Sequence, residues 1–214
     1  MPSSANASLI TLINPNAQAS EDFKSLRTKL NYSYKSENMK SFLITSIKSQ
    51  EGKSVLAANL AISYAQAGKR VLLIDANLRA PMLHKFFHME NHMGLSDLLS
   101  GKKQPGNVPI TTYVDGLSLL PAGAETGLHA TELLASNYLK LALDQFSTEY
   151  DMIFVDSSAA NKTADSFLLA VHCDGVVLAV KKRTVKQEEV VTFKQNLDAI
   201  KGNLVGFVFI DFEK

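Results

Sequence analysis

The chain has 214 residues, which is enough for one α/β domain with a full hydrophobic core. Hydrophobic residues make up 46% and charged residues 20%, the composition of an ordinary globular protein. The formal net charge of +1 gives no overall field toward anionic polymers, so no nucleic-acid partner is expected. The single cysteine, Cys173, excludes an internal disulfide and a multi-cysteine zinc site.

The first twenty residues are polar and contain neither the basic start nor the apolar block of a signal peptide. We therefore expect a flexible leader over residues 1–20, followed by a single domain over residues 21–214. The longest apolar stretches, such as residues 176–180, are too short to cross a bilayer. These features predict a cytoplasmic protein.

Short apolar runs alternate with amphipathic segments of helical length along the chain. This alternation is typical of an α/β fold, a mostly parallel central sheet with helices on both faces. The expected strands are residues 41–45, 71–75, 117–120, 152–156, 176–180 and 205–210. The expected helices are residues 21–32, 53–67, 130–146, 163–172 and 185–200. Residues 101–115 contain Pro105, Gly106 and Pro109 and are expected to form a surface connection.

The loop after the first expected strand has a phosphate-binding pattern. Residues 46–54 read SIKSQEGKS, and a helix is expected to follow. A phosphate loop needs backbone N–H groups at a helix N-terminus, a lysine for the β/γ-phosphates and a hydroxyl for Mg²⁺. Lys53 and Ser54 supply the last two, and Gly52 permits a close backbone approach. The general pattern has glycine where Ile47 stands, and the start of an ordinary helix is the alternative explanation.

Two aspartates end expected strands of the same sheet. Asp75 ends VLLID and Asp156 ends MIFVD. Ligands of open α/β sheets bind at the carboxyl ends of the strands, so both acids are expected in the same crevice as Lys53. One would hold Mg²⁺, and the other would accept a proton or position a nucleophile. The alternative is that each aspartate caps the turn that follows it.

The stretch LLIDANLRAP, residues 72–81, resembles the second nucleotide motif of the bacterial tyrosine kinases (BY-kinases) of capsular and exopolysaccharide systems. These are P-loop NTPases with a deviant Walker motif, related to the partition and division-site ATPases. Other stretches follow in that family's order: the leader with its E-x-x-R-x-x-R helix, then ATELLAS, then the third nucleotide motif YDMIFVDSS. The resemblance covers residues 9 to 210 and implies one ATP-binding kinase domain.

The resemblance also implies roles for the matching residues. The catalytic residues would be Lys53, Asp75 as the base for the tyrosine hydroxyl, and Asp156 as a Mg²⁺-linked acid. Arg79 and Pro81 would shape the loop after the second strand. The residues expected to contact ATP are Gly52, Lys53, Ser54, Val55, Lys48 and Glu51. Those expected to contact Mg²⁺ are Ser54, Asp156 and Asn77. Those expected at the contact that closes a ring-shaped or dimeric homo-oligomer are Glu21, Lys24 and Arg27.

The implied partner is a membrane-spanning polysaccharide co-polymerase or adaptor, which would recruit the chain to the inner face of the cell membrane. The sequence departs from the family pattern at several positions. Asn77 replaces an aspartate, and an amide brings no charge to the metal, so Mg²⁺ binding should weaken. The other departures are Ser49-Gln50 for Pro-Gly, Ser157-Ser158-Ala159 for Thr-Pro-Pro, and Ile210 near a family asparagine. Together they indicate altered or reduced catalysis.

The sequence ends GFVFIDFEK, where family kinases carry a tyrosine cluster that neighbouring subunits phosphorylate. Either that tail is missing from this sequence, or autophosphorylation is not the role of the chain. We hypothesise that Tyr32 and Tyr34 are the local substitutes.

Lys48 precedes Lys53 by five residues, where related dimeric ATPases keep a lysine that reaches the partner's nucleotide. A solvated loop lysine is the alternative. The residues His84, His88 and His92 would share one face of a continuous helix, as a zinc site requires, but Gly94 and the lack of further ligands favour a non-metal role. The basic residues 181–183 could contact nucleotide or form a solvated loop, and Cys173 is expected to fill space in the core.

Three functions remain open from the sequence. The first is an ATP-dependent tyrosine kinase that regulates capsular or exopolysaccharide biosynthesis. The second is a catalytically impaired regulator that binds nucleotide in the same system, which Asn77 and the altered phosphate loop favour. The third is a nucleotide-switched dimeric ATPase, which Lys48 favours and the L-R-x-P block disfavours.

Overall fold

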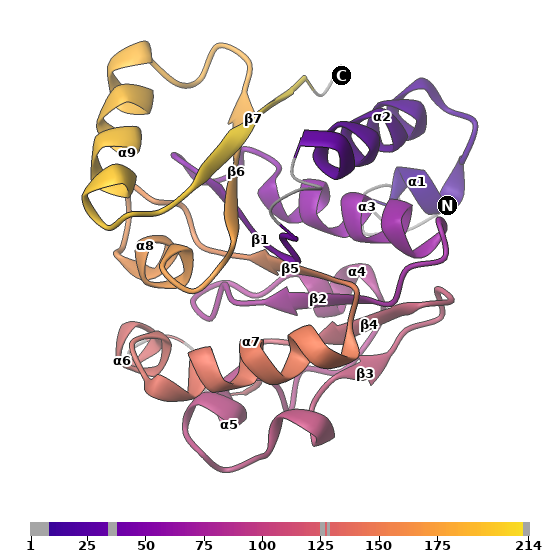
Figure 1. Cartoon of the computed structure of the whole chain (residues 1–214), viewed down its shortest axis with the longest axis vertical. Coiled ribbons are helices and arrows are strands. Elements are labelled where there is room, and N and C mark those ends of the chain that lie inside the picture. Colours follow the sequence, from indigo (N-terminus) through magenta and orange to yellow (C-terminus); the bar gives the residue numbers. More distant parts are fainter. Residues whose placement is uncertain (1–8, 34–37, 125–126, 128, 212–214) are drawn as a thin grey trace.

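The computed structural model describes residues 9–33, 38–124, 127 and 129–211 of the chain. Its centre is a seven-stranded sheet with the strand order β3-β4-β2-β5-β1-β6-β7 (Figure 1). The strands are β1 Ser41–Ser46, β2 Val71–Asp75, β3 Ile110–Thr111, β4 Leu117–Leu120, β5 Met152–Asp156, β6 Gly175–Lys181 and β7 Leu204–Ile210. Neighbouring strands are parallel except for β3 and β4, which are antiparallel. The expected α/β fold with a mostly parallel sheet is confirmed.

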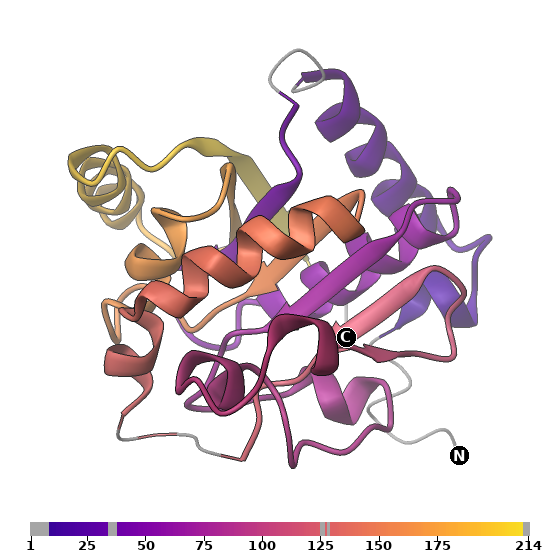
Figure 2. The same cartoon turned by 60° about the horizontal axis from the view of Figure 1, so that its bottom comes forward.

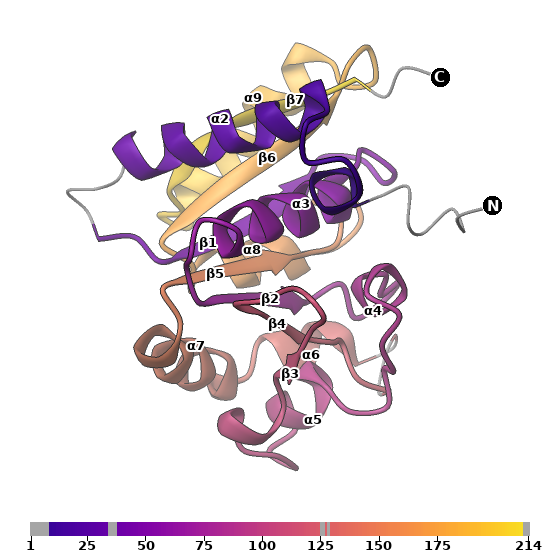
Figure 3. The ribbon, with the colours of Figure 1, turned by 90° about the vertical axis from the view of Figure 1, so that its right-hand side faces the viewer.

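Helices cover both faces of the sheet (Figures 1 and 3). On one face lie α1 Ile10–Ile13, α2 Gln18–Ser33, α3 Lys53–Ala65 and α4 Leu83–Phe86. On the other face lie α5 Leu95–Leu99, α6 Ala130–Leu134, α7 Asn137–Glu149, α8 Asp165–Ala170 and α9 Gln187–Ala199. Figure 2 shows α7 crossing this second face, where it packs against β5. A 3₁₀ turn, Pro105–Asn107, precedes β3.

The central strands β1, β2 and β5 are buried along their whole length. Successive side chains point to opposite faces, so Leu43 packs with the α5–α9 side while Phe42 and Ile44 pack with the α1–α4 side. Strands buried on both faces read as continuous apolar runs, and for this reason their positions follow directly from the sequence. These three strands also carry the loops that form the site.

Three expected elements differ from the structure. The helix expected over residues 130–146 is two helices, α6 and α7, because Ser136, at the N-cap position of α7, has an extended backbone (φ −73°, ψ 149°). The helix expected over residues 163–172 is shorter, Asp165–Ala170. The connection expected over residues 101–115 contains the edge strand β3, which is too short and exposed to leave an apolar run in the sequence.

Residues 9–20, which we expected to belong to a flexible leader, contain α1 and the start of α2. Leu9, Thr11 and Ser20 are buried there. The Thr11 N–H donates to Asn59 of α3 at 2.9 Å, and the Ser20 hydroxyl donates to the carbonyl of Asn14 at 2.7 Å. Residues 1–8 lie outside the described part of the chain. Among the helices that the structure describes, none is long and apolar enough to cross a bilayer.

Candidate nucleotide-binding site

The site lies at the carboxyl ends of β2, β5 and β1, which are neighbours in the sheet. Asp75 pairs with Asp156 in the register of β2 and β5, and Ile44 of β1 pairs with Asp156 from the other side. Both aspartates and the phosphate loop after β1 therefore reach the same edge, as the sequence predicts.

The phosphate loop, residues 46–54, is curled at the start of α3. Gln50 and Gly52 have positive φ angles of 63° and 81°, and α3 begins at Lys53. A left-handed conformation is favourable for glycine and uncommon for glutamine, so Gly52 suits its place. The loop leads directly into the N-terminus of α3, a helix of 13 residues. A helix N-terminus attracts phosphate in this type of loop.

The other side of the phosphate loop is tied to the segment between β6 and α9. Glu51 is 1% exposed and accepts hydrogen bonds from the backbone N–H of Lys48 at 2.9 Å and the Thr184 hydroxyl at 2.7 Å. The ammonium of Lys48 donates to the Glu189 carboxylate and to the carbonyl of Thr184, both at 2.8 Å. The side chains of Lys48 and Glu51 brace the loop within the same chain, and their expected contact with nucleotide stays a prediction.

Ile47 fills the position that the general motif gives to glycine. It is only 5% exposed and belongs to the core cluster on the α5–α9 side of the sheet. The departure from the motif therefore lies on the core side of the loop.

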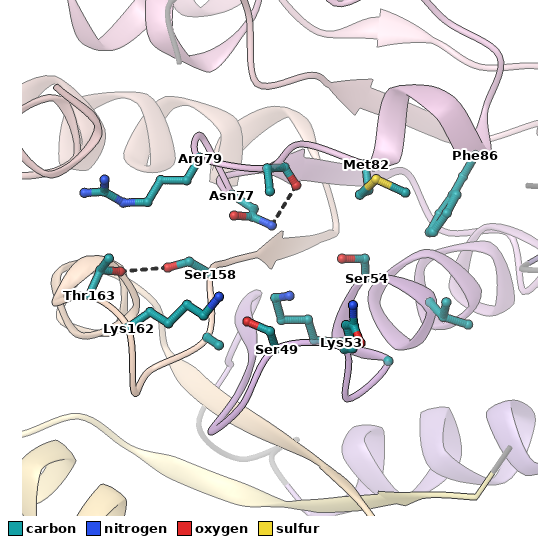
Figure 4. A pocket seen from close by; sticks show the side chains of 15 residues that line it. Ser49, Lys53, Ser54, Asn77, Arg79, Met82, Phe86, Ser158, Lys162 and Thr163 are labelled. Atoms are coloured by element: carbon teal, nitrogen blue, oxygen red, sulfur yellow. Dashed lines mark hydrogen bonds between the residues drawn. The ribbon is translucent and has the colours of Figure 1, made fainter. Parts of the chain in front are cut away.

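A pocket of about 870 Å³ opens beside the phosphate loop (Figure 4). Three loops line it, one after each of β1, β2 and β5. The lining residues are Ser49, Gln50, Gly52, Lys53, Ser54, Val55, Asn77, Arg79, Ala80, Met82, Phe86, Ser158, Ala159, Lys162 and Thr163. The expected residues Gly52, Lys53, Ser54, Val55 and Asn77 are thus brought together.

Asp75 is fully buried at the base of this site. Its Oδ2 accepts backbone N–H groups of Met82 and Leu83, both at 2.9 Å, and its Oδ1 accepts the N–H of Asn77 at 3.3 Å. Burial raises the pKa of Asp75, while these N–H groups and Lys53 lower it by less. Asp75 therefore organises the loop after β2, and its Oδ1 has the weaker hydrogen bond.

Asp156 has a different environment. Both of its carboxylate oxygens are buried, and neither makes a hydrogen bond of ordinary geometry with the described residues, although the Ser54 hydroxyl lies close enough to affect its pKa. Burial raises its pKa first, the neighbouring Asp75 raises it further, and Lys53 and the Ser54 hydroxyl lower it by less. A buried carboxylate without a donor is costly, and a hard cation beside it would supply the missing charge. The donor set of Asp156 and Ser54 therefore fits Mg²⁺.

The loop after β2 is fixed by two polar side chains. The Asn77 amide donates to the carbonyl of Ala80 at 2.9 Å, which leaves its oxygen as an acceptor at the pocket (Figure 4). Arg79 pairs with Asp165 at 2.9 Å and donates to the hydroxyl of Thr131 at 2.8 Å. Arg79 was expected to shape this loop, and it does so by linking the loop to α8 and α6.

The sequence matches the family CbiA, the CobQ/CobB/MinD/ParA nucleotide binding domain, over residues 42–214. The tyrosine-protein kinase YwqD of Bacillus subtilis (strain 168) is 34% identical over 200 residues, covering 94% of this chain and 84% of the relative. The chain belongs to the bacterial tyrosine kinase family.

Solved structures agree with this membership. The crystal structure of the chimerical protein CapA2B2 has a TM-score of 0.90 and 30% identity, covering 97% of this chain and 91% of that one. The kinase domain of the Escherichia coli tyrosine kinase Etk has a TM-score of 0.90 over 96% of this chain and 84% of its own. Its identity is 24%, so this second likeness shows the fold alone.

The residues expected at an oligomer contact make contacts within the chain. Glu21 and Lys24 form an ion pair at 2.7 Å on α2. Arg27 donates to the carbonyl of Ser63 and to its hydroxyl, the latter at 3.1 Å, and so links α2 to α3. Tyr64 is buried near Arg27. Burial raises the pKa of Tyr64 to about 12, and the charge of Arg27 lowers it by less.

The other residues noted in the sequence lie away from the pocket. The helix α4 ends at Phe86 and His88 has a φ of 53°, so the three histidines do not share one helix face. Across the described residues, no group of three or more His, Cys, Asp or Glu is placed to hold a metal ion. Lys182 pairs with Asp211 at 2.8 Å, and burial raises the pKa of Cys173 to about 12. Tyr32 is exposed, and Tyr34 lies outside the described residues.

Sequence reasoning missed Lys162 and the polar pair Ser158 and Thr163, which line the pocket. Lys162 follows Asp156 by six residues, in the loop after a central strand. That position at the carboxyl end of β5 is the signal that would have pointed to it.

Proposed function

We propose that the chain is a protein-tyrosine kinase that transfers the terminal phosphate of ATP to a tyrosine hydroxyl. The observation that supports it most strongly is the meeting of Lys53, Ser54 and the unpartnered carboxylate of Asp156 beside one pocket. This is the set of charges that phosphoryl transfer needs around a nucleotide. Membership of the tyrosine kinase family gives the acceptor, since YwqD is a tyrosine-protein kinase.

Each residue then has a part. The N-terminus of α3 and Lys53 bind the phosphates, and Gly52 and Val55 border them. Ser54, Asp156 and the Asn77 oxygen would hold Mg²⁺, which would neutralise part of the phosphate charge. Asp75 positions the loop after β2 and, through its more weakly bonded Oδ1, accepts the proton of the tyrosine hydroxyl.

The place of action follows from the same family. We propose that the chain works in the cytoplasm at the inner face of the cell membrane, as a homo-oligomer with a membrane-spanning polysaccharide co-polymerase. Glu21, Lys24 and Arg27 lie on α2, at the expected contact between subunits.

A second candidate is a regulator that binds nucleotide without efficient transfer. Its support is the environment of Asp75, whose two oxygens already accept three backbone N–H groups. A base that is occupied in this way, beside an uncharged Asn77, would slow proton transfer while leaving phosphate binding intact.

One experiment separates the candidates. The chain is incubated with γ-labelled ATP, Mg²⁺ and a synthetic Glu/Tyr copolymer, and phosphotyrosine and free phosphate are measured separately. Phosphotyrosine supports the kinase, free phosphate alone indicates an ATPase, and nucleotide binding without either product indicates the regulator.

Two variants serve as controls. Lys53→Met should abolish phosphotyrosine formation, because it removes the phosphate-binding charge. Lys140→Met, in an exposed ion pair with Asp144 on α7, should leave activity unchanged. Equal activity in wild type and Lys53→Met would contradict the proposal.

A further inference from the structure

Three cations line the pocket, and they differ in their partners. Arg79 is committed to Asp165 and Thr131. Lys53 lies close enough to Asp75 and Asp156 to lower the pKa of both carboxyls. Lys162 is an exposed residue that lines the same pocket, and its ammonium makes no hydrogen bond or ion pair with any residue in the described part of the chain. Figure 4 shows its side chain reaching from the loop after β5 into the pocket.

The backbone around Lys162 is fixed to the phosphate loop. The N–H of Ala160 donates to the carbonyl of Ser46 at 2.8 Å, and that of Asn161 to the carbonyl of Ile47 at 3.1 Å. Within the loop, the hydroxyls of Ser158 and Thr163 are hydrogen-bonded at 3.1 Å, as Figure 4 shows. The base of the Lys162 side chain therefore has a set position relative to the residues that begin the phosphate loop.

The position of Lys162 distinguishes it from Lys53. Lys53 is the first residue of α3, and the N-terminus of a helix attracts the phosphate groups of a bound nucleotide. Lys162 stands on the opposite side of the pocket from Ser54 and α3, on the loop that follows Asp156 (Figure 4). A free ammonium there faces an anion only when the bound molecule extends beyond the helix start.

We propose that Lys162 binds the terminal phosphate of a bound nucleoside triphosphate and so selects ATP over ADP. This inference rests on the nucleotide site of the proposed function. Lys162 adds a second phosphate-binding cation in a site where Asn77 brings no charge and Arg79 is already neutralised by Asp165. Because the contact is to the terminal phosphate, it contributes to ATP binding and not to ADP binding.

The test compares the affinities of two nucleotides for the full-length chain by calorimetry. The probes are the non-hydrolysable analogue AMPPNP and ADP, each with Mg²⁺. Lys162→Gln should weaken AMPPNP binding about tenfold, the effect of one charge-assisted hydrogen bond, and should change ADP binding less than about twofold. Lys162→Arg should restore most of the AMPPNP affinity, and Lys140→Gln on α7 is the matched control for a lost surface charge.

The outcomes separate this inference from the proposed function. Unchanged AMPPNP affinity in Lys162→Gln, or an equal loss for both nucleotides, would overturn the terminal-phosphate contact while leaving the nucleotide site in place. A wild-type chain that bound neither nucleotide would overturn both proposals. Selective loss of AMPPNP binding would support the Lys162 contact, even if the labelled-ATP assay gave no phosphotyrosine.

Discussion

The ammonium of Lys48 in the phosphate loop lies 2.8 Å from the carboxylate of Glu189 near the start of α9. The same ammonium donates to the carbonyl of Thr184, also at 2.8 Å. The sequence allows the interpretation that this lysine reaches a partner's nucleotide, but in this structure it is paired within its own chain. The first prediction follows from this pair.

We expect Lys48→Ala to change the rate of phosphate release from ATP by less than about twofold. The reason is that its ammonium is already paired with Glu189, and a half-exposed ion pair of this kind contributes little. Phosphate release is measured over a range of protein concentrations, with Glu189→Gln as the matched variant for the other partner. If Lys48→Ala abolished phosphate release while nucleotide binding stayed intact, the result would instead support the dimeric ATPase.

Glu51 should be important for stability. Its buried carboxylate accepts hydrogen bonds from Lys48 N–H and from Thr184, so Glu51→Ala leaves the Lys48 N–H without an acceptor, while the Thr184 hydroxyl can still donate to the carbonyl of Lys181. We expect the free energy of unfolding to fall by about 1–3 kcal/mol, measured by urea denaturation. Glu188→Ala, at an exposed position of α9, is the control. An unchanged urea midpoint for Glu51→Ala would show that the contacts between the phosphate loop and the β6–α9 segment do not stabilise the fold.

Asp156 should make the stability of the nucleotide-free chain fall with rising pH. Its pKa is raised in the folded chain by burial and by Asp75, so the folded state retains a proton that the unfolded state has released. This contribution to stability is fully present below the ordinary value of 3.8 and is lost as the pH rises through the raised pKa. The melting temperature of Asp156→Asn should therefore rise relative to that of wild type as the pH increases over this window.

Thermal melts without Mg²⁺ from acid to neutral pH give the measurement, and Asp198→Asn on α9 is the control. Adding Mg²⁺ with ADP should stabilise wild type more than Asp156→Asn, because only the carboxylate can hold the ion with its charge. A constant difference in melting temperature between the two proteins across this pH range would contradict the assignment.

Arg79→Met should lower the free energy of unfolding by about 2 kcal/mol. The side chain of Asp165 is only 2% exposed, and its carboxylate would lose its paired charge. The hydroxyl of Thr131 would still donate to this carboxylate. This figure lies below the usual cost of breaking a buried pair because Arg79 itself is 35% exposed. Arg70→Met is the control, since Arg70 pairs with Asp151 at the surface and its loss should not be measurable. Equal stability of the two variants would contradict a structural role for Arg79.

The sequence was sufficient for those parts of the fold that are buried on both sides. The strands β1, β2 and β5 read as apolar runs, and their shared edge predicts that Lys53, Asp75 and Asp156 lie together. The break before α7 is not predicted because α6 and α7 both have amphipathic patterns, and only two residues, Ala135 and Ser136, separate them. The sequence predicts a leader for residues 9–20 because part of what holds them in place is contact with α3, which is distant in sequence.

Side-chain partners were the part that the sequence could not give. Lys48 and Glu51 lie in a phosphate-loop motif, yet their partners Thr184 and Glu189 follow more than a hundred residues later. The burial of Asp156 without a donor depends on the packing of two neighbouring strands and leaves no local pattern. Lys162 was missed for the same reason, since its loop is placed at the site by hydrogen bonds to Ser46 and Ile47, which are distant in sequence.

The buried side chain of Ile47 has a consequence for anyone who redesigns this loop. Replacing it with glycine would make the loop look more like other nucleotide-binding sequences, but it would empty a volume that the core now fills. Such a consensus variant should be less stable than its parent, since truncating a large buried aliphatic residue costs about 2–5 kcal/mol. At this position, resemblance to the motif and fitness for this core are opposed.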